Sequence, residues 1–325
     1  MKVSTITHYL VAAALLCLTG TARSQGFSVE GCLAVLGDEK LALVHPTNFQ
    51  VLRVVEGVRL KDGPTEISTD GRWAMTVVSG RDEVRLTDLE KREPTKEVQV
   101  PWAPHPVAAF TSPDQRTAWI VSAGLKALIE CDTTAWTPKR RLALEGPVPV
   151  GALHQGDRIL VQTANSVSEI DLTQFQLLRT ETVLGTIEGL DWSARDGHEA
   201  MKIERAGGRK VWEFNRTAAG WVTDFVPAVD GLVRLWPGSI GVLSAARFNG
   251  QIWASKLQQG AHPWIHTYAE TAVDLECSPD GAKAYIALQQ AHQVVVADLA
   301  TGSEVAKVVL PFAPEKLQWV ASPNT

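Results

Sequence analysis

Short runs that alternate apolar with polar residues recur along the chain, and the last full repeat shows the unit clearly. Val273–Cys277 alternates in this way and ends at a Ser-Pro-Asp-Gly turn, and Ala284–Leu288 follows as a second run. After a polar loop come a third run, Val294–Ala297, which stops at Asp298, and a fourth, Val305–Leu310. Period-two runs separated by turn residues predict four antiparallel strands joined in chain order.

Turn segments of four residues mark the end of the first strand in each repeat. Their first residues lie 44, 42, 40, 42, 42 and 44 positions apart. A repeat of roughly 40 to 45 residues with four short strands is typical of the blades of a β-propeller. The turns begin at Ser68, Ser112, His154, Ala194, Trp236, Ser278 and Ser322.

A second marker is an acid or amide that closes the third strand. It lies 20 residues after the start of the turn in three repeats, and at 17 and 21 in two others. Side chains of this kind cap the backbone of a following turn, so we expect a structural role. The five residues are Asp88, Asp132, Asp171, Asn215 and Asp298.

The two ends of the repeat array are incomplete in complementary ways. The first repeat has runs for a second, third and fourth strand, at 33–36, 41–45 and 51–58, but none for a first strand. Lys316–Ala321 has the pattern of a first strand with nothing after it. We therefore expect an all-β protein, a seven-bladed β-propeller of four-stranded antiparallel blades, closed by the C-terminal strand joining the N-terminal blade. Such closure removes open sheet edges.

The first two dozen residues read as a cleaved signal peptide. Lys2 precedes an apolar run, Tyr9–Leu18, and small residues at Ala22 and Ser24 follow. The run is about half of the roughly 20 residues that span a bilayer, so no transmembrane anchor is expected. The predicted organisation is a signal peptide at 1–24 and one propeller domain at 25–325, and the predicted location is periplasmic or secreted.

Charge and cysteine content narrow the class further. The chain carries a formal charge of -5, and loss of Lys2 and Arg23 with the leader makes it -7, since no acid is lost. A mildly acidic chain without a basic cluster gives no electrostatic reason to expect nucleic acid. The three scattered cysteines, Cys32, Cys131 and Cys277, favour buried core residues, with a Cys32–Cys277 disulfide as the alternative.

The repeat resembles the YVTN-type β-propeller repeat of bacteria. The resemblance rests on Tyr285–Leu288, Val294–Asp298, Thr301-Gly302, Val305–Val309 and Ser322-Pro323. The resemblance implies an exported seven-bladed propeller. Relatives include surface-layer proteins and quinoprotein amine dehydrogenase large subunits. They also include the haem d1 propeller of nitrite reductases and lactonase-like hydrolases, so the resemblance leaves activity open.

Familiar catalytic motifs are absent from the sequence. There is no Cys-x-x-Cys-His for covalent haem, and Lys202 replaces the second histidine of a zinc motif begun by His198-Glu199. The Gly-x-Ser-x-Gly, Gly-x-Gly-x-x-Gly and phosphate-loop patterns do not occur. Eleven tryptophans are present, and those placed in second and third strands, such as Trp73 and Trp119, are expected to fill the space between blades.

One set of polar residues keeps a functional interpretation. Asp62, Glu188 and Asp230 share a repeat position six residues before the turns, with His105 and Glu315 at the adjacent position. In a propeller, the segments that lead into the first strands gather around one mouth of the central channel. These residues predict an acidic mouth that binds a divalent cation, a cationic small molecule or a basic partner; solvated loop carboxylates are the alternative.

The sequence therefore favours a non-catalytic binding or scaffolding module with a protein partner or small ligand at the channel mouth. No cofactor is predicted apart from the cation at the mouth. The rival interpretation is an accessory subunit of a quinoprotein-type oxidoreductase, or a lactonase-like hydrolase with its site at the same mouth.

Overall fold

A computed structural model describes residues 31–320, apart from 69–70, 79, 90–95, 113, 183–184, 196–197, 206–210, 218–219, 226–230, 236–240, 247 and 257–260. The described part is almost entirely strand, with one short 3₁₀ helix, η1 (Leu60–Asp62). The signal peptide predicted at 1–24, the seventh turn at Ser322 and Asp230 lie outside the described residues. No helix in the described part is long and apolar enough to cross a membrane.

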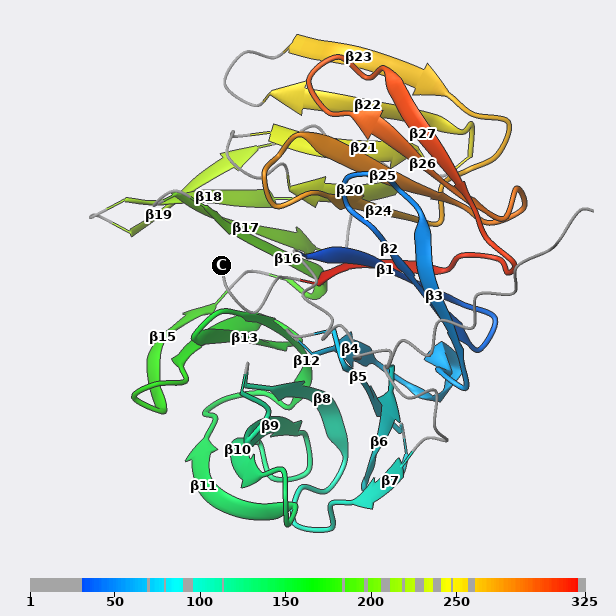
Figure 1. Cartoon of the computed structure of the whole chain (residues 1–325). Coiled ribbons are helices and arrows are strands. Elements are labelled where there is room, and N and C mark those ends of the chain that lie inside the picture. The colour runs from blue at the N-terminus through cyan, green and yellow to red at the C-terminus, as the bar shows by residue number, and fades with distance from the viewer. Residues whose placement is uncertain are drawn as a thin grey trace, which may run out of the picture.

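The strands form seven four-stranded antiparallel sheets (Figure 1). The sheet at the chain ends has the order β28 (Lys316–Val320), β1 (Cys32–Gly37), β2 (Lys40–Val44), β3 (Val51–Glu56). The next contains β4 (Thr65–Ile67), β5 (Trp73–Val77), β6 (Glu83–Asp88) and β7 (Lys96–Gln99). It is followed by β8 (Pro106–Thr111), β9 (Thr117–Ser122), β10 (Ala127–Asp132) and β11 (Thr137–Ala143).

The remaining four sheets continue in chain order. One contains β12 (Pro149–Gln155), β13 (Arg158–Thr163), β14 (Ser166–Asp171) and β15 (Gln176–Thr182). Another contains β16 (Ile187–Arg195), β17 (His198–Arg205), β18 (Val211–Thr217) and β19 (Gly220–Phe225). The next contains β20 (Gly231–Leu235), β21 (Gly241–Ala246), β22 (Gln251–Lys256) and β23 (Ala261–Thr267). The last contains β24 (Asp274–Cys277), β25 (Lys283–Leu288), β26 (Gln293–Asp298) and β27 (Glu304–Val309).

The C-terminal strand joins the N-terminal sheet, as the incomplete first repeat predicts. β28 pairs with β1 in an antiparallel register that runs from Cys32 opposite Val320 to Leu36 opposite Lys316. The strand therefore supplies the edge partner that β1 lacks in its own segment of chain.

Each sheet lies against the next through its first strand. Contacts run from β4 to β8, β12, β16, β20, β24 and β28. β28 in turn is bonded to β4, because Lys316 donates to the carbonyl of Thr65 at 2.8 Å and Gln318 donates to Glu66 at 2.9 Å. The series of contacts returns to the sheet where it began, with first strands near the centre and fourth strands outside (Figure 1).

The turns after the first strands are held by a recurring serine. The hydroxyl oxygen of Ser68 accepts the N–H of Trp73 at 2.8 Å, and that of Ser278 accepts the N–H of Lys283 at 2.9 Å. Ser112 does the same for Thr117 at 3.1 Å. A hydroxyl that satisfies a turn N–H explains why serine recurs at this position.

Three of the five residues that close third strands, Asp132, Asp171 and Asp298, cap turns as expected. Asp132 accepts the N–H groups of Thr134 at 2.8 Å and Ala135 at 3.1 Å. Asp298 accepts the N–H of Thr301 at 3.0 Å. These backbone bonds are the first cause that holds the pKa of both carboxyls below the ordinary value. Asp171 likewise accepts from Gln174 at 2.8 Å.

Candidate functional site

Two kinds of segment meet on one side of the sheets, and we call this side the linker face. It consists of the segments that join one sheet to the next and of the hairpins between the second and third strands. Because neighbouring strands are antiparallel, the turns after the first strands lie on the opposite side, the turn face. The predicted channel-mouth residues belong to the linker face.

Carboxylates fasten the linkers to the hairpins. Asp82, in the hairpin between β5 and β6, accepts the N–H of His105 at 2.9 Å. Asp38, in the hairpin between β1 and β2, accepts the N–H of Ala313 at 2.9 Å. In the sheet β24–β27 the direction is reversed: Glu270 of the linker accepts two hairpin N–H groups at 2.7 Å, from Gln290 and Ala291. Backbone segments far apart in sequence are thereby held in fixed positions.

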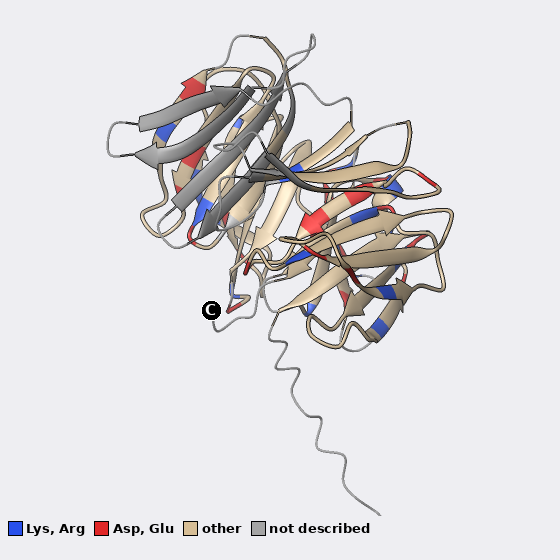
Figure 2. Cartoon of the chain, turned by 90° about the horizontal axis from the view of Figure 1, so that it is seen from above, with Lys and Arg blue, Asp and Glu red and all other residues tan. Residues whose placement is uncertain are grey.

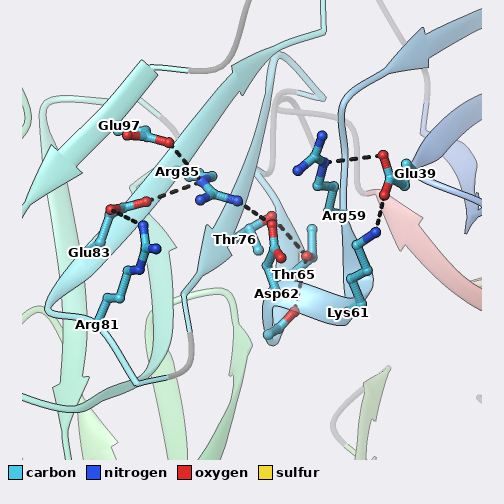
Figure 3. Close-up of polar contacts among 11 residues, drawn as sticks. Glu39, Arg59, Lys61, Asp62, Thr65, Thr76, Arg81, Glu83, Arg85 and Glu97 are labelled. Carbon is cyan, nitrogen blue, oxygen red and sulfur yellow. Dashed lines mark hydrogen bonds and ion pairs between the residues drawn. The ribbon is translucent and has the colours of Figure 1, made fainter.

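A second fastening joins the first two sheets. Glu39 lies beside both Arg59, at 3.2 Å, and Lys61, two cations of the linker that leads to β4 (Figure 3). The hydrogen bond from Lys61 is the first cause that lowers the pKa of Glu39 below the ordinary value. All three side chains are well exposed to solvent, so their contribution to stability is small.

Asp62 belongs to a charged network whose shared cation is Arg85. It ends η1 and pairs with Arg85 of β6 (Figure 3). Arg85 also bonds Glu83 at 3.1 Å and Glu97 at 3.2 Å, and Glu83 is buried, with 2% of its side chain exposed. A buried carboxylate requires such partners. A cation at Asp62 would therefore compete with the Arg85 guanidinium.

The contacts described for the other predicted site residues are not with one another. His105 is exposed, adopts a positive φ of 50°, and uses its backbone N–H for Asp82 and its carbonyl for Ala123 at 2.9 Å. Glu315 is exposed, and its N–H donates to Leu36 at 2.7 Å. Glu188 lies in the backbone of β16, and its side chain, like all of Asp230, is outside the described residues.

A belt of charged side chains on the first strands escaped the sequence interpretation. Arg234 of β20 bonds Asp274 of β24 at 2.8 Å, and the other oxygen of Asp274 accepts the N–H of Leu317 on β28 at 2.8 Å. Lys316, which shares a repeat position with Asp62, instead turns toward β4, 3.5 Å from Glu66. The sequence did offer a signal for these contacts. A charged residue inside a buried first strand indicates an ion pair, because charged side chains are seldom buried without a partner.

Two ion pairs between a buried glutamate and a more exposed arginine recur at one repeat position and were also missed. Glu130 of β10 faces Arg140 of β11, with 3.0 Å between Oε2 and Nε. Glu169 of β14 faces Arg179 of β15 at 2.6 Å and also bonds Arg158. Both glutamates come two residues before the acid that ends the third strand. Figure 2 shows acidic and basic segments interspersed over the described strands.

The three described cysteines, Cys32, Cys131 and Cys277, are free and buried, so the alternative of a Cys32–Cys277 disulfide is wrong for this structure. Burial raises the pKa of the Cys32 and Cys131 thiols to about 12. They are protonated at neutral pH and behave as small apolar residues. Among the described residues, no group of three His, Cys, Asp or Glu side chains is placed to hold a metal ion.

Comparison with known proteins assigns the class. No family model matches the chain, and no curated protein does. Among solved structures, dihydro-heme d1 dehydrogenase NirN in complex with DHE is similar, with a TM-score of 0.63 and 14% identity over 91% of this chain and 76% of that one. Hydrazine synthase of Kuenenia stuttgartiensis has a TM-score of 0.56 and 15% identity over 84% and 91%.

A third similar structure is Hsv2 of Kluyveromyces lactis, with a TM-score of 0.52 and 14% identity over 72% of each chain. These neighbours are β-propeller proteins. Together with the four-stranded antiparallel sheets, they show that this chain has a β-propeller fold. At such low identity the likeness carries the fold alone.

Proposed function

We propose that this protein is an exported seven-bladed β-propeller that binds a protein partner or small ligand on its linker face and performs no chemistry itself. The observation that supports it most is the fastening of linkers to hairpins by Asp38, Asp82 and Glu270. A backbone fixed before binding loses little conformational entropy when a partner arrives. The exposed side chains of that face, such as His105 and Glu315, then project from a rigid support.

Export and the closed ring are part of the same proposal. The leader pattern at 1–24 supports export, and the resemblance to YVTN-type repeats agrees with it. The pairing of β28 with β1 and the bonds from β28 to β4 support a ring of seven blades.

Charge changes on the two sides of the molecule test the binding face. The linker-face variant combines Lys61→Glu, His105→Glu and Glu315→Lys, and the turn-face control combines Arg116→Glu and Asp157→Lys, all at exposed residues. We expect a partner captured by the mature protein from a periplasmic extract to be lost with the linker-face variant alone. Loss with the control alone, or equal loss with both, would contradict the assignment.

The rival function is enzymatic, as an accessory subunit of a quinoprotein-type oxidoreductase or as a lactonase-like hydrolase. Two of the similar structures are enzymes by name, a dehydrogenase and a synthase. Metal analysis and a visible absorption spectrum of the purified mature protein separate the two proposals. A stoichiometric metal or a chromophore would favour the enzyme over the binding module.

The cation predicted at the mouth has its own test. If Asp62, Glu188 and Asp230 bind calcium, calcium raises the melting temperature of the wild type and not that of the Asp62→Asn, Glu188→Gln, Asp230→Asn variant. The pairing of Asp62 with Arg85 makes Arg85→Met an informative companion, because that change frees the carboxylate. An equal response in the wild type and the triple variant discards the cation site.

A further inference from the structure

One histidine lies where two sheets meet. His154 is the last residue but one of β12, the first strand of the sheet β12–β15, and its ring packs against two aromatic rings of the sheet β8–β11. The ring centroids are 5.3 Å from Phe110 and 5.8 Å from Trp119. Phe110 and Trp119 are opposite each other on β8 and β9, so the histidine contacts a cross-strand aromatic pair. Apolar residues of both sheets surround this contact as one core cluster.

The hydrogen bond of His154 fixes its neutral tautomer. Nε2 lies 2.9 Å from the carbonyl oxygen of Gly156. A carbonyl can only accept, so Nε2 carries the proton and Nδ1 holds the lone pair. The indole N–H of Trp119 next to it is buried and has no hydrogen-bond partner in the described structure. The neutral imidazole, with its lone pair on Nδ1, is compatible with Trp119, because an indole N–H can only donate.

We propose that His154 is an acid-sensitive wedge: protonation of Nδ1 places a charge and a further N–H donor against Phe110 and Trp119, and loosens the contact between the sheets β8–β11 and β12–β15. Two donors cannot satisfy each other, and a charge in an apolar contact is costly.

The charged groups on the surrounding elements are either bonded to other partners or exposed to solvent. On β10, Glu130 bonds Arg140, and on β13, Arg158 bonds Glu169. In the turn between β8 and β9, Asp114 accepts from Ser112 and from the backbone N–H of Arg116. Asp157, in the turn after His154, is exposed. The described contacts of the His154 ring are therefore the two aromatic rings of Phe110 and Trp119 and the carbonyl oxygen of Gly156.

The pKa of His154 agrees in direction. Burial lowers the pKa of this imidazole below its ordinary value, and the bond to Gly156 opposes the shift only in part. The unfolded chain therefore binds the proton more readily than the folded chain. Stability from the neutral histidine is complete above the unfolded pKa, and it is lost as the pH falls from there through the folded pKa.

Histidine-selective NMR and thermal unfolding test the wedge. In the full mature chain labelled with ¹³C-histidine, we expect the His154 ring to titrate at a lower pH in the folded protein than in the urea-unfolded protein. Hydrogen exchange of the 149–163 amides, corrected for intrinsic rates, is expected to increase between pH 7.5 and pH 5.5 relative to the 283–298 amides. The opening equilibrium can change by at most tenfold per pH unit, because one proton is bound.

Variants separate the wedge from general acid sensitivity. His154→Gln and His154→Phe are expected to flatten the pH dependence of local exchange and of melting temperature, while His292→Gln retains the wild-type dependence. Wild-type dependence in both His154 variants overturns the proposal. If neither variant folds, the wild-type titration decides, and a His154 ring that titrates at the same or a higher pH in the folded protein than in the unfolded protein overturns it as well.

Discussion

Two contacts between neighbouring sheets use the same geometry and different chemistry. Where β8–β11 meets β12–β15, aromatic residues adjoin His154 and the ion pair between the buried Glu130 and the partly exposed Arg140. Where β24–β27 meets the sheet of the chain ends, Tyr285 packs on Trp319 at 5.9 Å within an apolar cluster. The charged residue at this contact is Asp274 on the first strand, β24. Its carboxylate accepts from the side chain of Arg234 and from the backbone N–H of Leu317.

The difference separates what the repeat requires from what each contact adds. Both contacts bury apolar side chains from second and third strands, and this is the common requirement of stacked sheets. The first contact also depends on polar groups: the Glu130–Arg140 pair, which a substitution can break, and His154, which a proton can charge at mildly acid pH. The second depends on strand pairing and on one carboxylate fixed by three donors, the guanidinium of Arg234 and the N–H groups of Leu275 and Leu317.

Deleting 314–325 is expected to have the largest effect, because it removes β28 and exposes the edge of β1. Leu317 and Val320 are each 2% exposed, and burying two such side chains contributes about 3–6 kcal/mol. That is a large part of the roughly 5–15 kcal/mol that stabilises a domain. Calorimetry should show loss of the cooperative transition. Deleting only 322–325 is the control, and a wild-type transition in the longer deletion would contradict the role of β28.

Arg140→Ala is expected to come next, at about 2 kcal/mol, since it leaves the carboxylate of Glu130 buried without its cation. Arg140 also lies over the ring of Phe175, 4.4 Å from its centroid, and that contact is lost too. Urea unfolding of Arg140→Ala, Glu130→Gln and the double variant measures the coupling between the residues. If the losses of unfolding free energy in the two single variants add up to the loss in the double variant, the pair does not stabilise this contact.

Asp274→Asn is expected to cost about 1 kcal/mol. The amide oxygen keeps one acceptor, but the charge that Arg234 pairs with at 2.8 Å is lost. Arg234 is partly exposed, so the wild type should lose more stability than the variant when salt is raised. Thermal unfolding at low and high sodium chloride checks this, with Lys307→Gln as an exposed control. An identical salt response in wild type and Asp274→Asn would remove the ionic part of the interpretation.

Tyr285→Phe is expected to have the smallest effect, between no change and a gain of about 1 kcal/mol. The hydroxyl of Tyr285 is buried without a hydrogen-bond partner in the described structure, so its removal gives up no bond. Tyr285→Leu is the matched control, because it loses the contact with Trp319 and should destabilise. A clear loss in Tyr285→Phe would show that the hydroxyl is bonded in solution.

The local features could be predicted from the sequence, since they depend on neighbours in the chain. The runs at 284–288 and 294–297 correspond to β25 and β26, and Asp132 and Asp298 cap the turns expected of them. A period of two and the propensities of turn residues suffice for such features.

The partners of the candidate site residues could not be predicted, because they come from distant segments. Asp62 was assigned an acidic mouth, but Arg85 reaches it from the middle of the following sheet. Glu66 and Gln318 are 252 residues apart and adjacent in space. The repeat indicates which sheets are neighbours, but side-chain direction and length decide which charges meet. His154 did give a signal, as a histidine at the turn position that serine holds in four other repeats.

The side-by-side position of Cys32 and Val320 bears on how the chain can be reconnected. A hairpin of about two to five residues would bridge two antiparallel strands at that point. The backbone would then be continuous, and new termini could be cut into an exposed part of a turn, for example between Ala300 and Thr301. Such circular permutants would keep every strand pairing while moving the chain ends to a site chosen for fusion to another protein.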